Sequence, residues 1–388
     1  MDVLKPVFFS LIFFFFTAFM PAFADLPFKG VFNEKELTPA AVQVRQTIIS
    51  AETAGVTQIY PIVLVPGYLG TDKYEVVFVD MDYWLKIERA LEDAGFTEVH
   101  VADITGAGYS SAGPITQLPW YDGETYDAYI EPDPDCVGRS HELKAIVEHI
   151  IGSNGLNASK VNIIAHSQGA LTSRWMISQL GMADRVNALI SLSGANKGVD
   201  LTKLAVGEVS LPPSIVNPTE SLLSWVIGGV TDSAGSHARG SHVEMWPEYT
   251  ENVFNPNCPD MPGVKYFSFS GKMNWNYMLS EFWLIHALYK TDYFNVREDD
   301  GLISVHSTKG PFHDHPDPDI AGNWIWMGEV VGKKVIPGTG IESDVLGVYW
   351  GVDHGEFMNF PLGLTELFHF DTSRFFVDCA RLLNAYSD

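Results

Sequence analysis

The chain has 388 residues, of which 46% are hydrophobic and 13% aromatic, and its formal net charge at pH 7 is −24. This length allows one large domain or two smaller ones, with enough apolar residues for a sizeable core. The excess of acidic residues argues against nucleic acid as a partner, because a negatively charged surface repels phosphates. It is compatible with a secreted enzyme.

The N-terminal segment has the features of a secretory signal peptide. Lys5 precedes an apolar run from Pro6 to Met20, and Ala22-Phe23-Ala24 fits an A-x-A cleavage site. The alternative is an uncleaved membrane anchor, but the run is short for a spanning helix. We therefore expect residues 1–24 to be a signal peptide and residues 25–388 to be secreted, to an extracellular or periplasmic location.

Strand-like and helix-like segments then alternate along the chain. Residues 60–65 (YPIVLV) form a continuous apolar run, which is typical of a strand buried on both faces. The alternation predicts an α/β fold, with a mainly parallel sheet and helices on both of its faces. The further segments that carry this prediction are strands at 98–102, 161–165 and 186–193 and helices at 82–94, 140–151 and 170–180.

Two segments interrupt the alternation. Residues 200–255 are irregular and contain the short apolar stretch SLLSWVIGGV at 221–230. Residues 311–345 are rich in proline, histidine, aspartate and glycine, and their HDHPDPD stretch at 313–319 is either a metal site or an ordinary surface loop. We expect both segments to be insertions in the alternating fold.

Residues 161–169 have the pattern of a nucleophile elbow, the turn between a strand and a helix that holds a catalytic serine. The expected strand Val161–Ala165 leads into His166-Ser167-Gln168-Gly169. The usual G-x-S-x-G pattern has a glycine where this chain has Ala165. Alanine is also small and the position does not require a positive φ, so Ser167 remains the candidate nucleophile.

A catalytic serine needs a histidine base and a carboxylate, and in α/β-hydrolases both follow the serine in the order acid, then histidine. The candidate acid is Asp300, although Asp300-Gly301 could also be an ordinary turn. The candidate base is His354, in a glycine-flanked loop. Three other histidines in the same late region are rivals: His306, His313 and His315.

The oxyanion of such a reaction is stabilised by backbone N–H groups from two places. One is the residue after the nucleophile, which is Gln168, and the other is the loop after an early strand, which points to Tyr68. Gly67 would let the backbone approach the substrate closely.

Eight segments in order make the chain resemble the bacterial true triacylglycerol lipases of the Pseudomonas and Burkholderia type, within the α/β-hydrolase superfamily. The resemblance implies an α/β-hydrolase fold, a triad of Ser167, Asp300 and His354, and an oxyanion hole formed by Tyr68 and Gln168. It also implies that Arg139 braces the oxyanion loop. The segments are YPIVLVPGYLGTDKY (60–74), DYWLKI (82–87), GRSHEL (138–143), KVNIIAHSQGALTSRW (160–175), SGANKGVDL (193–201), KYFSFSG (265–271), DDGLIS (299–304) and DHGEFMN (353–359).

Several positions depart from the family pattern. Pro66 stands where the family has the histidine of a His-Gly pair, and His306 replaces the second cysteine of the family disulfide. Of the three cysteines, Cys258 could therefore pair with Cys136 or stay free, and an odd count leaves at least one thiol free or paired between chains. The third is Cys379.

The resemblance also implies a structural calcium ion, for which Glu356 and Glu281 are the corresponding ligands. It places a lid around residues 200–255, with 221–230 as its apolar part or, alternatively, as a helix packed permanently on the body. The insertion around 311–345 is absent from the family pattern.

These observations together predict a secreted triacylglycerol lipase or carboxylesterase that forms an acyl-enzyme at Ser167 and needs no cofactor for its chemistry. The expected partners are a lipid or other ester substrate and the lipid–water interface. The resemblance, and not the sequence itself, implies a dedicated folding chaperone. Alternatives are an acyltransferase or phospholipase that uses the same triad, a catalytically silent lipid-binding relative, or a metal-dependent enzyme centred on residues 313–319.

Overall fold

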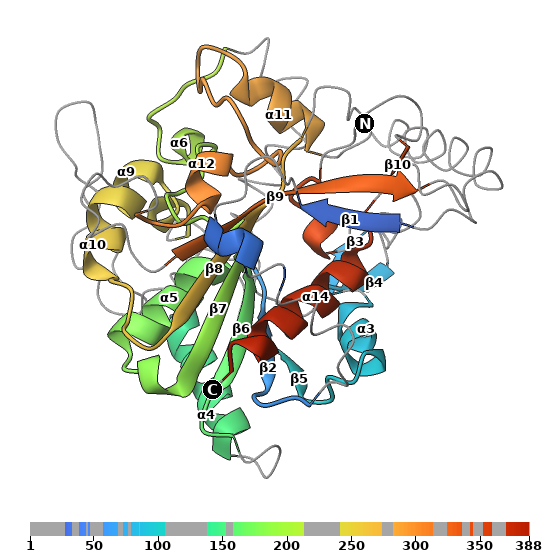
Figure 1. Ribbon diagram of the computed structural model, residues 1–388. Helices are drawn as coiled ribbons and strands as arrows, with labels where there is room; N and C mark the ends of the chain where they lie inside the picture. Colours follow the sequence, from blue (N-terminus) through green and yellow to red (C-terminus); the bar gives the residue numbers. More distant parts are fainter. Residues whose placement is uncertain are drawn as a thin grey trace.

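A computed structural model of the chain (Figure 1) describes most of the strands and helices expected from the sequence. The residues that it describes are 28–32, 39–43, 46, 57–68, 73–76, 79–84, 86–104, 138–152, 158–212, 241–273, 282–312, 324–335, 342–343, 352–358 and 370–387. The predicted signal peptide (1–24) and the apolar stretch of the predicted lid (221–230) lie outside these residues.

A central sheet of eight strands organises the molecule. Its order is β1-β9-β8-β7-β6-β2-β5, and β10 pairs with β9. The six strands from β9 to β5 run parallel, whereas β1 and β10 are antiparallel to β9. The strand bounds are β1 Phe28–Phe32, β2 Ile62–Val65, β5 Val99–Val101, β6 Val161–His166, β7 Val186–Leu192, β8 Lys265–Ser270, β9 Trp324–Val335 and β10 Glu342–Ser343; β3 Lys73–Val76 and β4 Val79–Asp82 form a separate hairpin.

The inner strands are apolar on both faces because helices cover both faces. In β2, Ile62 and Leu64 join a core with α3 and α14, while Val63 and Val65 join a second core with α4 and α5. Figure 1 shows these two helix pairs on opposite sides of the sheet. The predicted fold class, a mainly parallel sheet with helices on both faces, is therefore confirmed.

Most predicted helices agree with the structure, but the first one begins later than expected. It was predicted over residues 82–94, whereas α3 starts at Ile87, because Lys86 has a φ of 65° and breaks the helical backbone. The helix bounds are α3 Ile87–Asp93, α4 Arg139–Gly152, α5 Gly169–Gln179, α6 Thr202–Ala205, α9 Pro247–Tyr249, α10 Asn255–Asn257, α11 Trp283–Tyr289, α12 Val305–Thr308 and α14 Thr372–Ala385; short 3-10 turns lie at Ala183–Arg185 and Glu356–Met358, and a π-helical segment at Thr250–Phe254.

The segment 311–345 is not an insertion throughout. Its residues 324–335 form β9, which pairs in parallel with β8 and antiparallel with β1. The prediction of an irregular insertion is wrong for these residues, because Trp324, Trp326 and Met327 are buried in the sheet. The HDHPDPD stretch at 313–319 lies outside the described residues.

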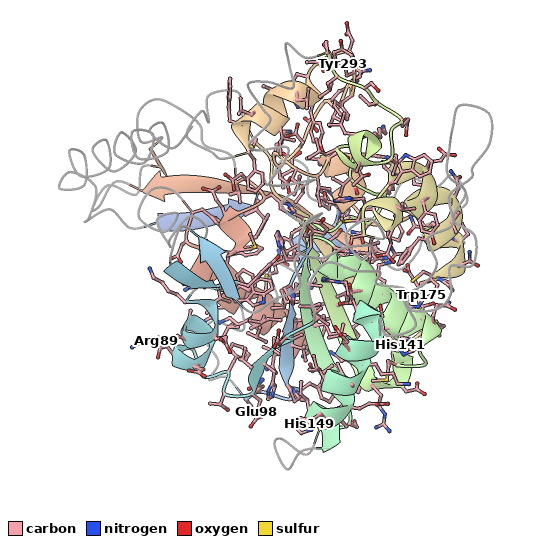
Figure 2. The ribbon with its side chains drawn as sticks, turned by 180° about the vertical axis from the view of Figure 1, so that it is seen from behind. Arg89, Glu98, His141, His149, Trp175 and Tyr293 are labelled. Atoms are coloured by element: carbon pink, nitrogen blue, oxygen red, sulfur yellow. The ribbon has the colours of Figure 1, made fainter. Side chains whose placement is uncertain are left out.

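A third group of buried residues covers the carboxyl ends of the parallel strands. It includes Leu171 of α5, Val243, Phe254 and Ile285 of α11. Figure 2 shows Tyr293, just after α11, at the opposite end of the molecule from Glu98 and His149. The carboxyl edge, where α/β proteins hold their sites, is therefore enclosed by its own apolar layer. None of the described helices is both long enough and apolar enough to cross a membrane.

Candidate active site

Ser167 occupies a sharp turn between β6 and α5. Its φ is 56°, a left-handed conformation that a residue other than glycine adopts at a cost in strain. The turn is anchored on the neighbouring strand, because the Ser167 N–H donates to the Leu192 carbonyl at 3.1 Å and its own carbonyl accepts from Ala195 N–H at 3.3 Å. Such a strained strand-to-helix turn is the geometry of a nucleophile elbow.

The turn needs small residues on both sides. A Cβ atom built on Gly169 would lie 2.6 Å from the carbonyl oxygen of Pro66, so a side chain there would strike the loop after β2. Ala165, which replaces the first glycine of the usual pattern, is fully buried in β6. Its single methyl group fits within the core shared with α4 and α5.

The loop after β2 passes directly over Ser167. A Cβ atom on Gly67 would lie 2.6 Å from the Ser167 Cβ and 3.1 Å from its Oγ, so only glycine allows this approach. Arg139, buried at the start of α4, donates from Nη2 to the carbonyl oxygens of Gly67 at 2.7 Å and Pro66 at 3.1 Å. It thus contacts the loop that the resemblance assigned it to brace.

Asp300 and His354 lie together, as the predicted triad requires. Asp300 Oδ2 and His354 Nδ1 are 2.8 Å apart, and both side chains are almost fully buried. The other carboxylate oxygen, Oδ1, accepts the N–H groups of Leu302 at 3.0 Å and Ile303 at 2.7 Å. A carboxylate held in this way keeps the Nδ1 proton on the imidazole and leaves Nε2 as the basic nitrogen.

The imidazole of His354 packs against the elbow. Its ring centroid is 4.4 Å from that of His166, the residue before Ser167, and 6.0 Å from the ring of Phe282. Among the rival histidines, His306 is exposed on α12, and His313 and His315 lie outside the described residues.

Glu356 fixes the loop that carries His354. Its Oε2 accepts the N–H of Asp353 at 2.8 Å, and its own N–H donates to Asp353 Oδ1 at 3.0 Å. Thr372 of α14 donates to the Glu356 carbonyl at 3.0 Å. Glu281, the second predicted calcium ligand, lies outside the described residues. Among the described residues, no group of three or more His, Cys, Asp or Glu side chains is arranged to hold a metal ion. The described residues therefore do not form a cation site by themselves, and calcium stays a prediction.

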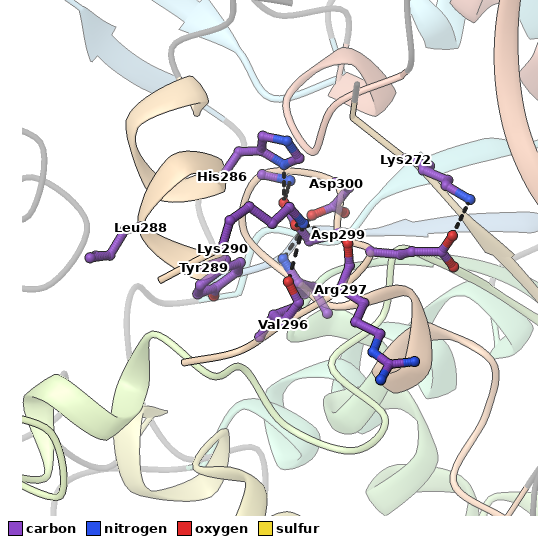
Figure 3. Close-up of polar contacts among 12 residues, drawn as sticks. Lys272, His286, Leu288, Tyr289, Lys290, Val296, Arg297, Asp299 and Asp300 are labelled. Carbon is purple, nitrogen blue, oxygen red and sulfur yellow. Dashed lines mark hydrogen bonds and ion pairs between the residues drawn. The ribbon is translucent and has the colours of Figure 1, made fainter. Parts of the chain in front are cut away.

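A second aspartate–histidine pair, Asp299 with His286, lies beside Asp300 (Figure 3). Asp299 Oδ1 is 2.8 Å from His286 Nδ1 of α11 and accepts the Gly301 N–H at 2.8 Å. Asp299 Oδ2 is 2.5 Å from Lys290 Nζ, so this buried carboxylate has a cationic partner. No sequence motif indicates this pair, because its members are separated along the chain and follow no spacing rule.

Tyr83 and His166 form a further contact that sequence reasoning missed. The Tyr83 hydroxyl accepts the Gly67 N–H at 2.8 Å and is hydrogen-bonded to His166 Nδ1 at 2.7 Å. Burial lowers the pKa of His166 well below 6.5, which favours the neutral imidazole at neutral pH. The Asp-Tyr-Trp motif was the available signal, but it did not reveal this partner. The Gly67 N–H is already bonded to Tyr83. The next amide in the loop that could donate to an oxyanion is therefore that of Tyr68.

Two of the three cysteines are described, and both are free thiols. Cys258 and Cys379 are buried, at 1% and 2% exposure. Burial raises the pKa of the Cys258 thiol to about 11, which makes it a poor nucleophile at neutral pH. Cys136 lies outside the described residues.

The topology and the elbow define an α/β-hydrolase fold, and residues 60–217 match the family model described as the alpha/beta hydrolase fold. The chain is 28% identical over 222 residues to a triacylglycerol lipase of Burkholderia plantarii, covering 57% of this chain and 49% of the relative. It is also 28% identical over 193 residues to a triacylglycerol lipase of Pseudarthrobacter phenanthrenivorans, covering 50% and 48%.

These matches confirm the resemblance to bacterial triacylglycerol lipases, although they span about half the length of those two relatives. Among solved structures, the Staphylococcus hyicus lipase superimposes with a TM-score of 0.49 at 15% sequence identity, covering 84% of this chain and 95% of that chain.

Proposed function

We propose that the protein is a serine hydrolase of carboxylic esters, with lipid esters as its substrate class. The observation that carries the proposal is the packing of the buried Asp300–His354 pair against the elbow of Ser167, through the ring of His166. This arrangement supplies a nucleophile, a base and a carboxylate in the chain order of α/β-hydrolases. The triacylglycerol lipase names of the sequence relatives support lipid esters as the substrates.

In this reaction His354 Nε2 removes the proton from the Ser167 hydroxyl as its oxygen attacks the ester carbonyl. Asp300 holds the imidazole in the required tautomer and stabilises the imidazolium that forms. The backbone N–H groups of Tyr68 and Gln168 stabilise the oxyanion. The protonated His354 then gives its proton to the leaving alcohol, and water releases the acyl group by the same steps in reverse.

The closing experiment measures hydrolysis of para-nitrophenyl esters with acyl chains from short to long, together with labelling by a fluorophosphonate probe. We expect the wild type to hydrolyse these esters and to be labelled at Ser167. Ser167→Ala should lose labelling and at least 10⁴-fold in kcat, roughly the loss known when a triad is broken. A folded wild-type chain that is neither labelled nor active would overturn the proposal in favour of a silent lipid-binding relative.

The same series, run with calcium and with a chelator, tests the predicted structural ion separately. Export to an extracellular or periplasmic location belongs to this proposal and rests on the sequence of residues 1–24. The mass of the chain recovered outside the cytoplasm checks it, because cleavage after Ala24 leaves Asp25 as the first residue.

A further inference from the structure

Residues 241–244, Ser-His-Val-Glu, contact the side chains of both residues whose amides form the proposed oxyanion hole; we call them the 241–244 clamp. On one side, His242 Nε2 is hydrogen-bonded to the Tyr68 hydroxyl at 2.8 Å. The two rings lie with centroids 5.4 Å apart, inclined by 32°. His242 is 6% exposed, so this contact is largely shielded from water.

On the other side, the clamp binds the amide group of Gln168. Its Nε2 donates to the hydroxyl of Ser241 at 3.1 Å and to Oε2 of Glu244 at 3.3 Å. Ser241, Glu244 and Gln168 are fully buried. Both hydrogens of the Gln168 amide are therefore used, which fixes the orientation of the side chain at the start of α5.

The clamp is held by the residues that follow it in the chain and by the apolar layer over the strand ends. The Thr250 hydroxyl donates to the Glu244 carbonyl at 2.7 Å, and the Met245 N–H donates to the Ser241 carbonyl at 2.9 Å. Val243 is buried in the apolar layer over the carboxyl ends of the strands. A segment anchored in this way can hold other groups in place.

The loop after β2 depends on such support at Tyr68. Arg139 holds the carbonyl oxygens of Pro66 and Gly67, and Tyr83 holds the Gly67 N–H. Tyr68 is the next residue, and its side chain is tied to the clamp. An oxyanion hole acts through donors that are fixed before the charge develops, so small displacements of either amide reduce the rate.

We propose that the 241–244 clamp positions the two oxyanion donors, with His242 acting on Tyr68 and Glu244 acting on Gln168. This inference rests on the proposed ester hydrolysis. Neither residue touches the reacting atoms, so both are positioning residues. Their loss should lower kcat, which depends on transition-state stabilisation, more than it raises KM.

The test uses the whole chain and para-nitrophenyl butyrate, with kcat, KM and Tm measured for each variant. Tyr68→Phe and His242→Leu should each lower kcat about tenfold and change KM less than about twofold. The expected loss in kcat is smaller than that for deleting an oxyanion donor outright, because the amides are displaced and not removed. The double variant should be no slower than either single one, because both remove the same hydrogen bond. His242→Gln should restore most of the rate, since an amide can still bond to the Tyr68 hydroxyl.

The Gln168 side is tested in the same way. Glu244→Leu should lower kcat by a similar factor, whereas Glu244→Gln, which keeps an acceptor oxygen, should retain most of it. Tyr266→Phe is the matched control, because the Tyr266 hydroxyl is also buried and accepts the Met261 N–H at 3.0 Å, but on the amino side of β8. It should lower Tm and leave kcat unchanged.

The outcomes separate the two proposals. An active wild type in which Tyr68→Phe and His242→Leu keep their kcat, or lose no more than Tyr266→Phe does, would overturn the clamp and leave ester hydrolysis standing. A wild type that hydrolyses no ester and is not labelled at Ser167 would overturn both.

Discussion

Two aspartate–histidine pairs lie next to each other, on consecutive aspartates, and they differ in what surrounds them. Asp299–His286 and Asp300–His354 have the same 2.8 Å separation. Asp299 also has Lys290 at 2.5 Å, whereas the second oxygen of Asp300 accepts the backbone N–H groups of Leu302 and Ile303. The ring of His354 packs on the elbow through His166.

Because both pairs have the same separation, a short Asp–His contact does not by itself indicate a catalytic role. A carboxylate that already has a cation stabilises an imidazolium less than one whose other contacts are neutral N–H groups. Asp299 and its partners connect α11 to the acid turn and so contribute to stability, in our interpretation, while the Asp300 pair serves the reaction. Four tests distinguish these two roles.

The largest difference is expected between the two histidines. His354→Gln should lower kcat on the order of 10⁶-fold, because it removes the base, as triad histidine substitutions do elsewhere. His286→Gln should change kcat by less than about tenfold and lower Tm. Steady-state kinetics with para-nitrophenyl butyrate and thermal melts check both, and comparable losses of kcat in the two variants would contradict the assignment.

The two aspartates should differ in the same direction but by less. Asp300→Asn should lower kcat about 10⁴-fold, because an amide favours the wrong imidazole tautomer. Asp299→Asn should mainly lower stability, because it leaves the ammonium of Lys290 without its carboxylate. A kcat loss at Asp299 equal to that at Asp300 would mean that the two acids act as one unit.

Lys290 tests the stabilising role directly. Lys290→Met should lower the free energy of unfolding by about 3 kcal/mol, because it leaves a fully buried carboxylate without its cation. The double variant Lys290→Met/Asp299→Asn should recover part of this loss, since the uncompensated charge is gone. Urea unfolding of the wild type, the two single variants and the double variant measures the interaction energy of the two side chains. Additive losses of stability would show that Lys290 and Asp299 do not stabilise the fold through their ion pair.

The smallest effect, counted per pH unit, is a pH dependence of stability on the catalytic side of the comparison, where His166 packs on His354. Burial, and secondarily the charge of His354, keep the pKa of His166 well below 6.5 in the folded chain. The unfolded chain therefore binds one more proton once the pH falls below about 6.5, so the stability present above that pH decreases. This contributes a slope of up to about 1.4 kcal/mol per pH unit.

His166→Gln should flatten that slope in urea unfolding curves taken between pH 7 and pH 4. His242, whose pKa burial lowers to about 4, adds a slope of the same sign between pH 6.5 and about pH 4. His242→Gln should therefore flatten the curve only above about pH 4. An unchanged slope in His166→Gln would exclude its neutral buried state.

The sequence predicted the parts of the molecule whose signals are local. β2 is a continuous apolar run, β6 contains the strand-forming residues Val161, Ile163 and Ile164, and the elbow is a short motif between a strand and a helix. The strand β9 was missed because Trp324–Val335 contains two glycines, a glutamate and two lysines, and its role depends on distant partners.

In the site, too, the residues that belong to a known motif order could be predicted, and the contacts between distant residues could not. Asp300 and His354 could be named because they follow Ser167 in a known order, and the structure places them at 2.8 Å. The Asp299–His286 pair and the contact of Tyr68 with His242 could not be, because they join residues with no fixed spacing. Such contacts arise only from how the elements pack.

The pairing of β1 with β9 has a consequence for how the protein folds during its synthesis. Phe32 of β1 lies opposite Val330 of β9, so nearly the whole chain must leave the ribosome before this strand can find its partner. Until then its hydrogen-bonding groups are open to other chains, and a sheet edge of this kind favours aggregation. The rate of synthesis and the chaperones that bind unfolded chains should therefore influence the yield of folded protein more than mutations in the early strands do.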